Sequence, residues 1–166
     1  GTYDDVTYWL KNGVVGLGFL STSSAKDIPI EPLWRDPLLC IVPKGMKKEK
    51  DTDYMDIGEI RNHQFVTQRE STDADIQNFL KENSINIQSN YHVVDDLSTV
   101  AMVANGFGIC LMPQMVMRDI PYEVDCYPVQ PYAERVIGLA TLHPEFLAPA
   151  VRSMYNHILE NYKEDF

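Results

Sequence analysis

The sequence predicts an α/β protein in which strands and helices alternate along the chain. Near-continuous apolar runs at 14–20, 38–42 and 109–112 are typical of strands that are buried on both faces. The segments around them place apolar residues at helical spacing behind residues that can cap a helix. Because this alternation is typical of βαβ units, we expect a mostly parallel sheet.

The expected helices begin at recognisable caps. Thr2 and Asp5 have the spacing of a capping box, and the helix that follows should end at Asn12-Gly13. Pro149 suits the first position of the last helix. Further helices are expected after 71–73 and 95–96, a weak helical turn at 56–60, and further strands at 64–67, 91–94, 123–128 and 135–142.

The chain is acidic. Its 166 residues contain 14 Lys and Arg against 24 Asp and Glu, which gives a net charge of -10 at pH 7. This charge repels a phosphate backbone, so we do not expect this chain to bind nucleic acid by itself. The one basic run should be a solvated loop; it contains Lys44, Lys47, Lys48 and Lys50.

Other compositional features exclude several classes of protein. The apolar stretches are too short to cross a membrane, and residues 1–5 lack the basic start of a signal peptide, so we expect a cytoplasmic protein. The cysteines Cys40, Cys110 and Cys126 each lie among apolar residues and are expected to be buried free thiols. The four histidines have no ligand-like spacing, so we expect no metal and no cofactor.

Several motifs occur in an order that is specific when taken together. They are Gly13-x-x-Gly16-Leu17-Gly18-Phe19, Pro32-Leu33-x-x-Asp36-Pro37-Leu38, Val42-Pro43 and Val94-Asp95-Asp96-x-Ser98-x-Val100-x-Met102-Val103-x-x-Gly106-x-Gly108-Ile109-x-Leu111-Met112-Pro113. Along its whole length the chain resembles the effector-binding domain of LysR-type bacterial transcription regulators.

The resemblance implies a two-lobed α/β fold similar to that of periplasmic binding proteins, with two strands crossing the hinge. It places lobe I at 1–40 together with 140–166, and lobe II at 41–139. The crossing strands should be 38–42 outward and 135–141 on return. The function that it implies is the sensing of a small polar or anionic metabolite in the cleft between the lobes.

The chain departs from the family pattern at its start. The winged helix-turn-helix that binds DNA and the linker helix are absent from this chain, and lobe I is expected to be truncated at its N-terminus. The intact regulator should be a homo-oligomer. This chain alone is expected to be a monomer or an atypical dimer, because the helix through which family members usually pair is lacking.

Candidate ligand-binding residues follow from the rule that ligands bind beyond the carboxyl ends of strands in open α/β sheets. Ser21 and Thr22 end a strand of lobe I, and Thr67, Gln68 and Arg69 end a strand of lobe II. Small hydroxyls and an amide give directional hydrogen bonds, and an arginine can clamp a carboxylate. The alternatives are a plain turn for Ser21 and Thr22, helix-entry hydrogen bonds for Thr67 and Gln68, and a solvated charge for Arg69.

Two further features have competing interpretations. Met112 and Pro113 end a strand and are expected to form an apolar wall of the site, although they could equally pack in the core. The adjacent carboxylates of Asp95 and Asp96 are typical of a helix start, where the dipole stabilises them, rather than of an acid/base pair. We therefore expect no catalytic residue. The alternative function is a freestanding solute-binding protein or a small enzyme on the same fold.

Overall fold

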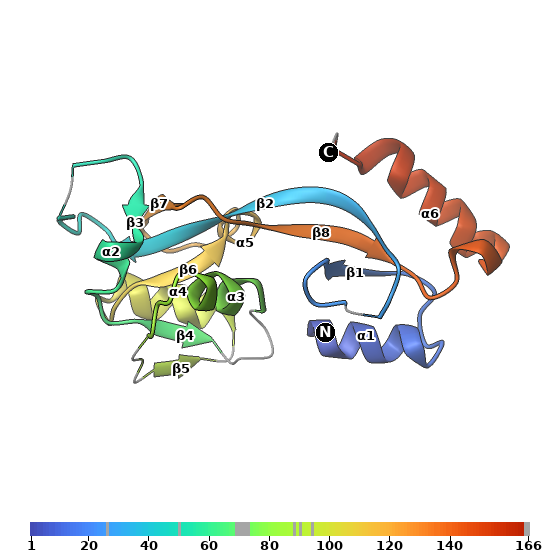
Figure 1. Cartoon of the computed structure of the whole chain (residues 1–166), viewed down its shortest axis with the longest axis horizontal. Coiled ribbons are helices and arrows are strands. Elements are labelled where there is room, and N and C mark those ends of the chain that lie inside the picture. Colours follow the sequence, from blue (N-terminus) through green and yellow to red (C-terminus); the bar gives the residue numbers. More distant parts are fainter. Residues whose placement is uncertain are drawn as a thin grey trace. The chain divides into compact units, whose positions relative to one another are not determined.

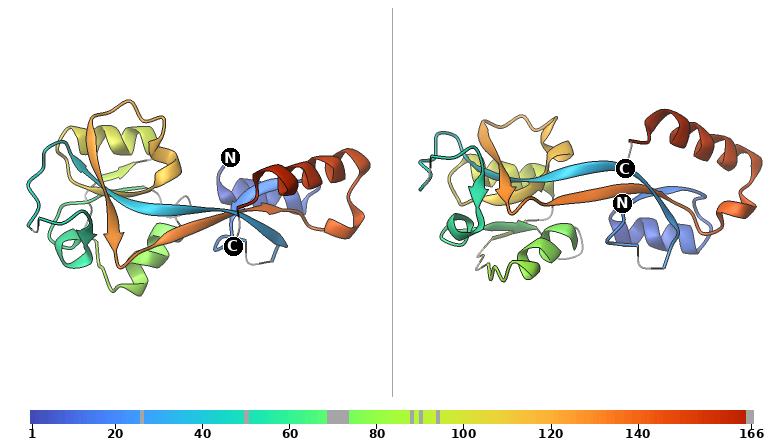
Figure 2. Two further views of the ribbon diagram at one scale, coloured as in Figure 1. Left: turned by 90° about the horizontal axis from the view of Figure 1, so that it is seen from above. Right: turned by 45° about the horizontal axis from the view of Figure 1, so that its top comes forward.

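The computed structural model describes residues 1–25, 27–49, 51–68, 74–87, 89, 91–93 and 95–164, and Figure 1 labels its helices and strands. The chain divides into two compact units: unit 1 contains residues 1–36 and 135–166, and unit 2 contains residues 37–134. Two strands carry the chain from one unit to the other, and they can be followed in Figure 2.

Unit 1 combines helices with the strands that leave and re-enter it. Its elements are α1 (Tyr3–Lys11), β1 (Gly18–Ser21), the first half of β2 (Ile30–Pro43), nearly all of β8 (Glu134–Ala140), the 3-10 helix η1 (Pro144–Phe146) and α6 (Pro149–Tyr162).

Unit 2 contains the second half of β2 and the longer run of alternating elements. They are β3 (Met55–Asp56), α2 (Ile57–Ile60), β4 (Val66–Gln68), α3 (Ala74–Glu82), β5 (Tyr91–Val93), α4 (Asp96–Ala104), β6 (Cys110–Pro113), α5 (Gln114–Met117) and β7 (Val124–Gln130).

The mixed α/β class is as predicted, but the expectation of a mostly parallel sheet was wrong. The pairs β1·β8, β2·β6 and β2·β7 are antiparallel, whereas β3·β7 and β4·β5 are parallel. A helix between two strands makes them parallel only where it connects neighbouring strands of one unit. Strand β2 leads out of unit 1 and β8 leads back to it, so the strands that pair with them can be antiparallel.

The first helix begins and ends where the sequence predicts. The Asp5 amide donates to Thr2 Oγ1 at 3.2 Å and the Thr2 amide donates to Asp5 Oδ2 at 2.8 Å, which completes the capping box. The Val14 amide then bonds back to the carbonyl of Trp9 at 2.8 Å. Because this bond places Val14 in the turn that follows the helix, Val14 is not part of the strand predicted at 14–20, and β1 begins at Gly18.

The strand β2 is much longer than the predicted 38–42. It begins at Ile30 and continues through Pro32 and Pro37, two residues that usually interrupt a strand because they have no amide proton. The boundary between the units falls between Asp36 and Pro37, so the missing donor lies where the strand passes from one unit to the other.

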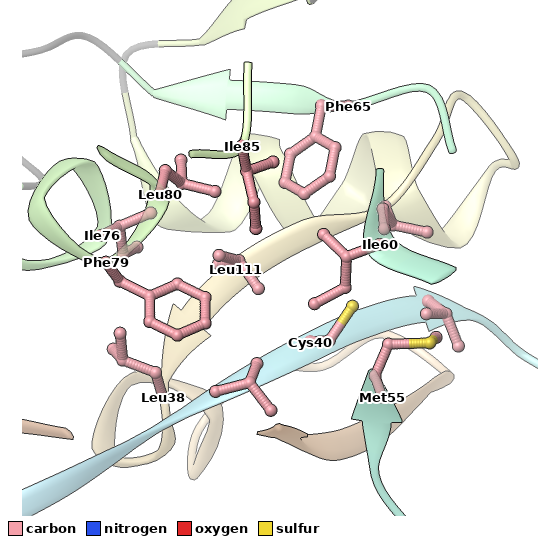
Figure 3. Packing of buried hydrophobic residues seen from close by; sticks show 13 residues of the cluster. Leu38, Cys40, Met55, Ile60, Phe65, Ile76, Phe79, Leu80, Ile85 and Leu111 are labelled. Atoms are coloured by element: carbon pink, nitrogen blue, oxygen red, sulfur yellow. The ribbon is translucent and has the colours of Figure 1, made fainter. Parts of the chain in front are cut away.

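Separate hydrophobic clusters stabilise the units. Figure 3 shows the largest, in unit 2, where side chains from β2, β3, α2, α3 and β6 meet around Leu111. A second cluster in unit 2 gathers Ile41, Val100 and Met112, and a third in unit 1 gathers Leu10, Leu20 and Ala140. No residue of α6 is fully buried in the part of the chain that the structure describes, but one face of the helix is partly buried, through Val151, Tyr155, Ile158 and Leu159.

A buried ion pair joins β2 and β8 at the point where both leave unit 1. The Asp36 carboxylate has no exposed surface, and Arg135 reaches its Oδ2 through both Nε and Nη2 at 2.8 Å. Arg135 Nη1 also donates to the Tyr3 hydroxyl at 3.2 Å. One guanidinium therefore ties α1 to both crossing strands.

Replacing Arg135 with leucine should strongly destabilise unit 1, because it leaves the Asp36 carboxylate buried without its counter-charge. We expect a loss of about 3 to 5 kcal/mol in the free energy of unfolding. Urea unfolding followed by tryptophan fluorescence measures it, since Trp9 and Trp34 are the only tryptophans and both belong to unit 1. Tyr3→Phe, which removes the hydroxyl that accepts from Arg135 but keeps the ion pair, should cost less, about 1 kcal/mol; equal losses would contradict the assignment.

The three thiols differ in exposure, which corrects the expectation that all are buried. Cys40 and Cys110 are buried, whereas Cys126 on β7 is exposed. Burial is the main cause that raises the pKa of Cys40 far above its usual value. Partial desolvation and the Asp125 carboxylate raise the pKa of Cys126 to a smaller extent.

A thiol reagent should therefore label only Cys126 in the native protein, and slowly at neutral pH, since the thiolate is the reactive form. Mass spectrometry of the protein treated with a maleimide should show one adduct, and all three after unfolding. Cys126→Ser should leave the native protein unlabelled. Rapid native labelling at Cys40 would show that the buried strand opens readily.

The basic run is more ordered than the solvated loop that the sequence predicted. Lys44 Nζ donates to Asp125 Oδ1 at 2.9 Å, and the Gly45 amide donates to Asp125 Oδ2 at 2.8 Å. Lys48 donates to the carbonyls of Thr52 and Tyr54 and lies over the Tyr127 ring. Contacts with β7 and with nearby backbone carbonyls, rather than with an external anion, account for these two lysines.

Asp125 gives this loop a pH-dependent contribution to stability. The hydrogen bonds from Lys44 and from the Gly45 amide lower the pKa of Asp125 below 3.8, so its stabilising effect is present above that value and is lost as pH falls through the lowered pKa. Asp125→Asn should lower the melting temperature at pH 7, and the difference from wild type should shrink below about pH 4. Melting followed by circular dichroism tests this, with the exposed Asp119→Asn as control.

Candidate functional site

The strand-end residues of unit 1 form a turn rich in hydroxyl groups. Ser21, the last residue of β1, is fully buried, and its Oγ lies 3.0 Å from Ser23 Oγ. The Ser23 amide donates to Ser21 Oγ at 3.3 Å, and the Ser24 amide donates to the Ser21 carbonyl at 3.0 Å. Ser21 thus organises the turn that displays the residues after it.

Thr22 and Ser24 are the other two hydroxyl residues of this turn. Thr22 is exposed, and its amide donates to the carbonyl of Val136 on β8 at 2.9 Å, which fixes the backbone beside the neighbouring strand. Ser24 Oγ is buried and has no hydrogen-bond partner in the structure as described. Four hydroxyl residues follow one another at 21–24, and only Ser21 and Thr22 were predicted as site residues, because burial without a partner is a property that no sequence pattern reveals.

In unit 2, Thr67 uses its hydroxyl to join two strands. Its Oγ1 donates to the carbonyl of Tyr91 at 3.1 Å and lies 3.0 Å from His92 Nδ1. The parallel register of β4 and β5 places Thr67 opposite His92, which is exposed. His92 was not predicted as a site residue, because only strand pairing brings it beside Thr67.

A small crevice opens beside Thr67. Its volume is about 20 Å³, enough for one water-sized group, and its polar lining comes from Thr67, Gln77 and Thr99 among apolar side chains such as Ile76 and Leu111. Thr99 Oγ1 already donates to the Asp95 carbonyl at 2.8 Å. The crevice offers hydroxyl oxygens, which remain able to accept hydrogen bonds.

The other predicted residues of unit 2 are placed differently. Gln68 ends β4 with its backbone paired to Val93, but its side chain lies outside the described residues, as do Arg69 and the predicted helix cap at 71–73. Met112 and Pro113 are both buried in β6, and Met112 belongs to the second core cluster. Their position fits the core-packing alternative, while contact with a ligand stays a prediction.

The two adjacent carboxylates act at the start of a helix. Asp95 is the N-cap of α4, and its Oδ1 accepts the Ser98 amide at 2.8 Å. This hydrogen bond lowers the pKa of Asp95 below 3.8, which favours the charged form. A carboxylate held charged by a helix N-terminus is a cap, as the sequence predicts.

Metal-binding clusters and membrane-spanning helices are both lacking among the residues that the structure describes. Within these ranges no group of three or more His, Cys, Asp or Glu residues could hold a metal ion. No described helix is long and apolar enough to span a bilayer.

Two α/β units connected by strands β2 and β8 are the architecture of domains that are similar to periplasmic binding proteins. Residues 1–163 match the LysR substrate binding domain, and the chain belongs to this family.

Solved structures agree with the fold. The effector binding domain of QuiR, solved in complex with shikimate, has a TM-score of 0.84 and 22% sequence identity, and the match covers 96% of this chain and 78% of that one. The regulatory domain of CcmR from Synechocystis PCC6803, solved in complex with 2-PG, has a TM-score of 0.84 and 14% identity over 98% of this chain and 81% of that one.

A curated relative supports the same family. The probable HTH-type transcriptional regulator LrrA of Synechococcus elongatus is 24% identical over 144 residues, which cover 86% of this chain and 48% of the relative. The chain thus spans about half the length of this relative.

Proposed function

We propose that this chain senses a small polar or anionic metabolite on behalf of a LysR-type transcription regulator. The hydroxyl-rich turn after β1 is the observation that carries the proposal, because the buried hydroxyl of Ser24 has no partner among the residues that the structure describes. Such a group costs about 1 to 3 kcal/mol until it is satisfied, and a small rearrangement of the turn on ligand binding would give it a partner. Ser21 and Thr22 in unit 1 and the strand-end residues Thr67, Gln68 and Arg69 in unit 2 are proposed as ligand contacts.

The nature of the ligand follows from these groups and from the family. Hydroxyls and backbone amides at strand ends recognise carboxylates, phosphates and sugar hydroxyls. Two relatives of the same fold were solved with shikimate and with 2-PG. We therefore propose a small oxygen-rich metabolite rather than an apolar one.

The proposed mechanism is a shift between conformations. A ligand changes the population of two arrangements only if it binds one of them better. Strands β2 and β8 connect the units, so a preference for one arrangement would pass through these strands. In the intact homo-oligomeric regulator, which would act in the cytoplasm, the change would reach a DNA-binding domain outside this chain.

We also propose that the chain has no catalysis of its own. Asp95 is occupied as a helix cap, because its Oδ1 accepts the Ser98 amide. An activated nucleophile needs a base within hydrogen-bond reach. Met112 and Pro113 are proposed as an apolar support behind the site rather than as reacting groups.

A thermal-shift screen tests the proposal. Carboxylates, amino acids, sugars and phosphate esters are added to the whole chain, and one of them should raise the melting temperature with saturation. At a ligand concentration 100 times Kd the stabilisation should be about 2.7 kcal/mol. Complete absence of a saturable ligand, or turnover of the compound that binds, would contradict sensing.

Ser24→Ala tests the site itself. It removes an unpartnered buried hydroxyl, so the ligand-free protein should be equally or more stable, while the affinity for the ligand found in the screen should fall about fivefold or more. Ser153→Ala on the exposed face of α6 makes the same chemical change elsewhere in unit 1 and should alter neither quantity. If Ser24→Ala binds as tightly as wild type, the turn is not the site.

A further inference from the structure

Unit 2 contains a second hollow at the amino ends of β4 and β5, the opposite ends of these strands from the proposed effector contacts. It is lined by residues 60–65 and 85–87, and its volume is about 400 Å³. We call it the amino-edge pocket. Volumes of 300 to 1,000 Å³ are typical of small-molecule sites.

The accessible surface of the pocket is mainly polar. Ile60, Phe65 and Ile85 lie behind it, because their side chains are buried members of the main core cluster, and Figure 3 shows them pointing into that cluster. Arg61 and Asn86 are exposed at the rim. No carboxylate lines the pocket, although the chain as a whole carries a net charge of -10. The local chemistry is therefore opposite to that of the whole molecule.

Arg61 is held in place by the protein. Its Nη2 donates to the Asn83 carbonyl at 2.6 Å, beyond the end of α3. A guanidinium has five N–H donors, so this single bond leaves others available for a guest. Because the bond fixes the side chain beforehand, less conformational entropy is lost when an anion binds.

His63 is a second donor in the lining. Its Nε2 is buried and has no hydrogen-bond partner among the described residues. Because no bond at this nitrogen is present in the structure as described, it is the ring nitrogen that is free to bond to a guest. Asn86 adds an amide, whereas the amide of Asn62 is already bonded to Glu49 Oε1 at 3.2 Å.

The helix ends near the pocket do not oppose an anion. Helices α2 and α3 both end close to it, and free carbonyls there would repel negative charge. The carbonyls of Glu59 and Ile60 accept the amides of Asn62 and His63, and the carbonyl of Leu80 accepts the amide of Ile85. With these carbonyls satisfied, the rim presents donors.

We propose that the amino-edge pocket binds a small anionic metabolite that carries carboxylate or phosphate groups. Arg61 would pair with the anion, and His63 and Asn86 would donate hydrogen bonds to it. This site is separate from the strand-end residues of the proposed effector site and would give the domain a second ligand.

An NMR titration of the whole chain tests the pocket. Citrate and inorganic phosphate are the probes, added at constant ionic strength to the isotope-labelled protein. At least one of them should cause saturable shifts at the backbone amides of 61–64 and 86–87. Asn86→Asp places a negative charge at the rim without touching the bond between Arg61 and Asn83, and should weaken binding at least about tenfold.

Asn78→Asp is the matched control, since it adds the same charge at an exposed position of α3 outside the pocket. It should bind the probe like wild type, and Arg61→Gln should not bind it. Three results would overturn the proposal: no saturable shift with either probe, equal weakening by both aspartates, or shifts confined to residues near Ser21 and Thr67. The last would assign the probe to the effector site and leave the proposed function intact.

Discussion

The buried pair of Asp36 and Arg135 is the interaction on which the rest of unit 1 depends. A carboxylate with no exposed surface requires a counter-charge, and Arg135 is the partner that satisfies it from the neighbouring strand. The pair lies where β2 leaves unit 1 and β8 returns to it, and Tyr3 extends the connection to α1. The strand ends that carry the hydroxyl turn are positioned by elements that this one guanidinium holds together.

The polar groups of the described site are mostly committed to the backbone. Ser21 shapes its own turn, Thr67 joins β4 to β5, and Asp95 caps α4. Groups held in this way cannot move far, which favours recognition of a fixed ligand shape. Ser24 is different, because its hydroxyl is buried without a partner, and this contrast is the reason that we place it at the centre of the proposed effector site.

The two ends of β4 and β5 have different chemistry. Beside Thr67, a crevice of about 20 Å³ offers the hydroxyl oxygens of Thr67 and Thr99, whereas the pocket of about 400 Å³ at the amino ends offers Arg61 and His63. One short parallel pair therefore separates a hydrogen-bonding surface from a cationic one. If both proposals hold, the domain can respond to two metabolites through the same core.

The sequence by itself determined the class of fold, the family, the caps of α1 and α4 and the start of α6, because apolar periodicity and capping are local properties. Only the tertiary structure decided the strand directions, the continuation of β2 through Pro37, the exposure of Cys126 and the meeting of Thr67 with His92. These depend on which distant segments pack together. A buried hydroxyl without a partner, such as that of Ser24, depends on the absence of a contact, and no local pattern encodes an absence.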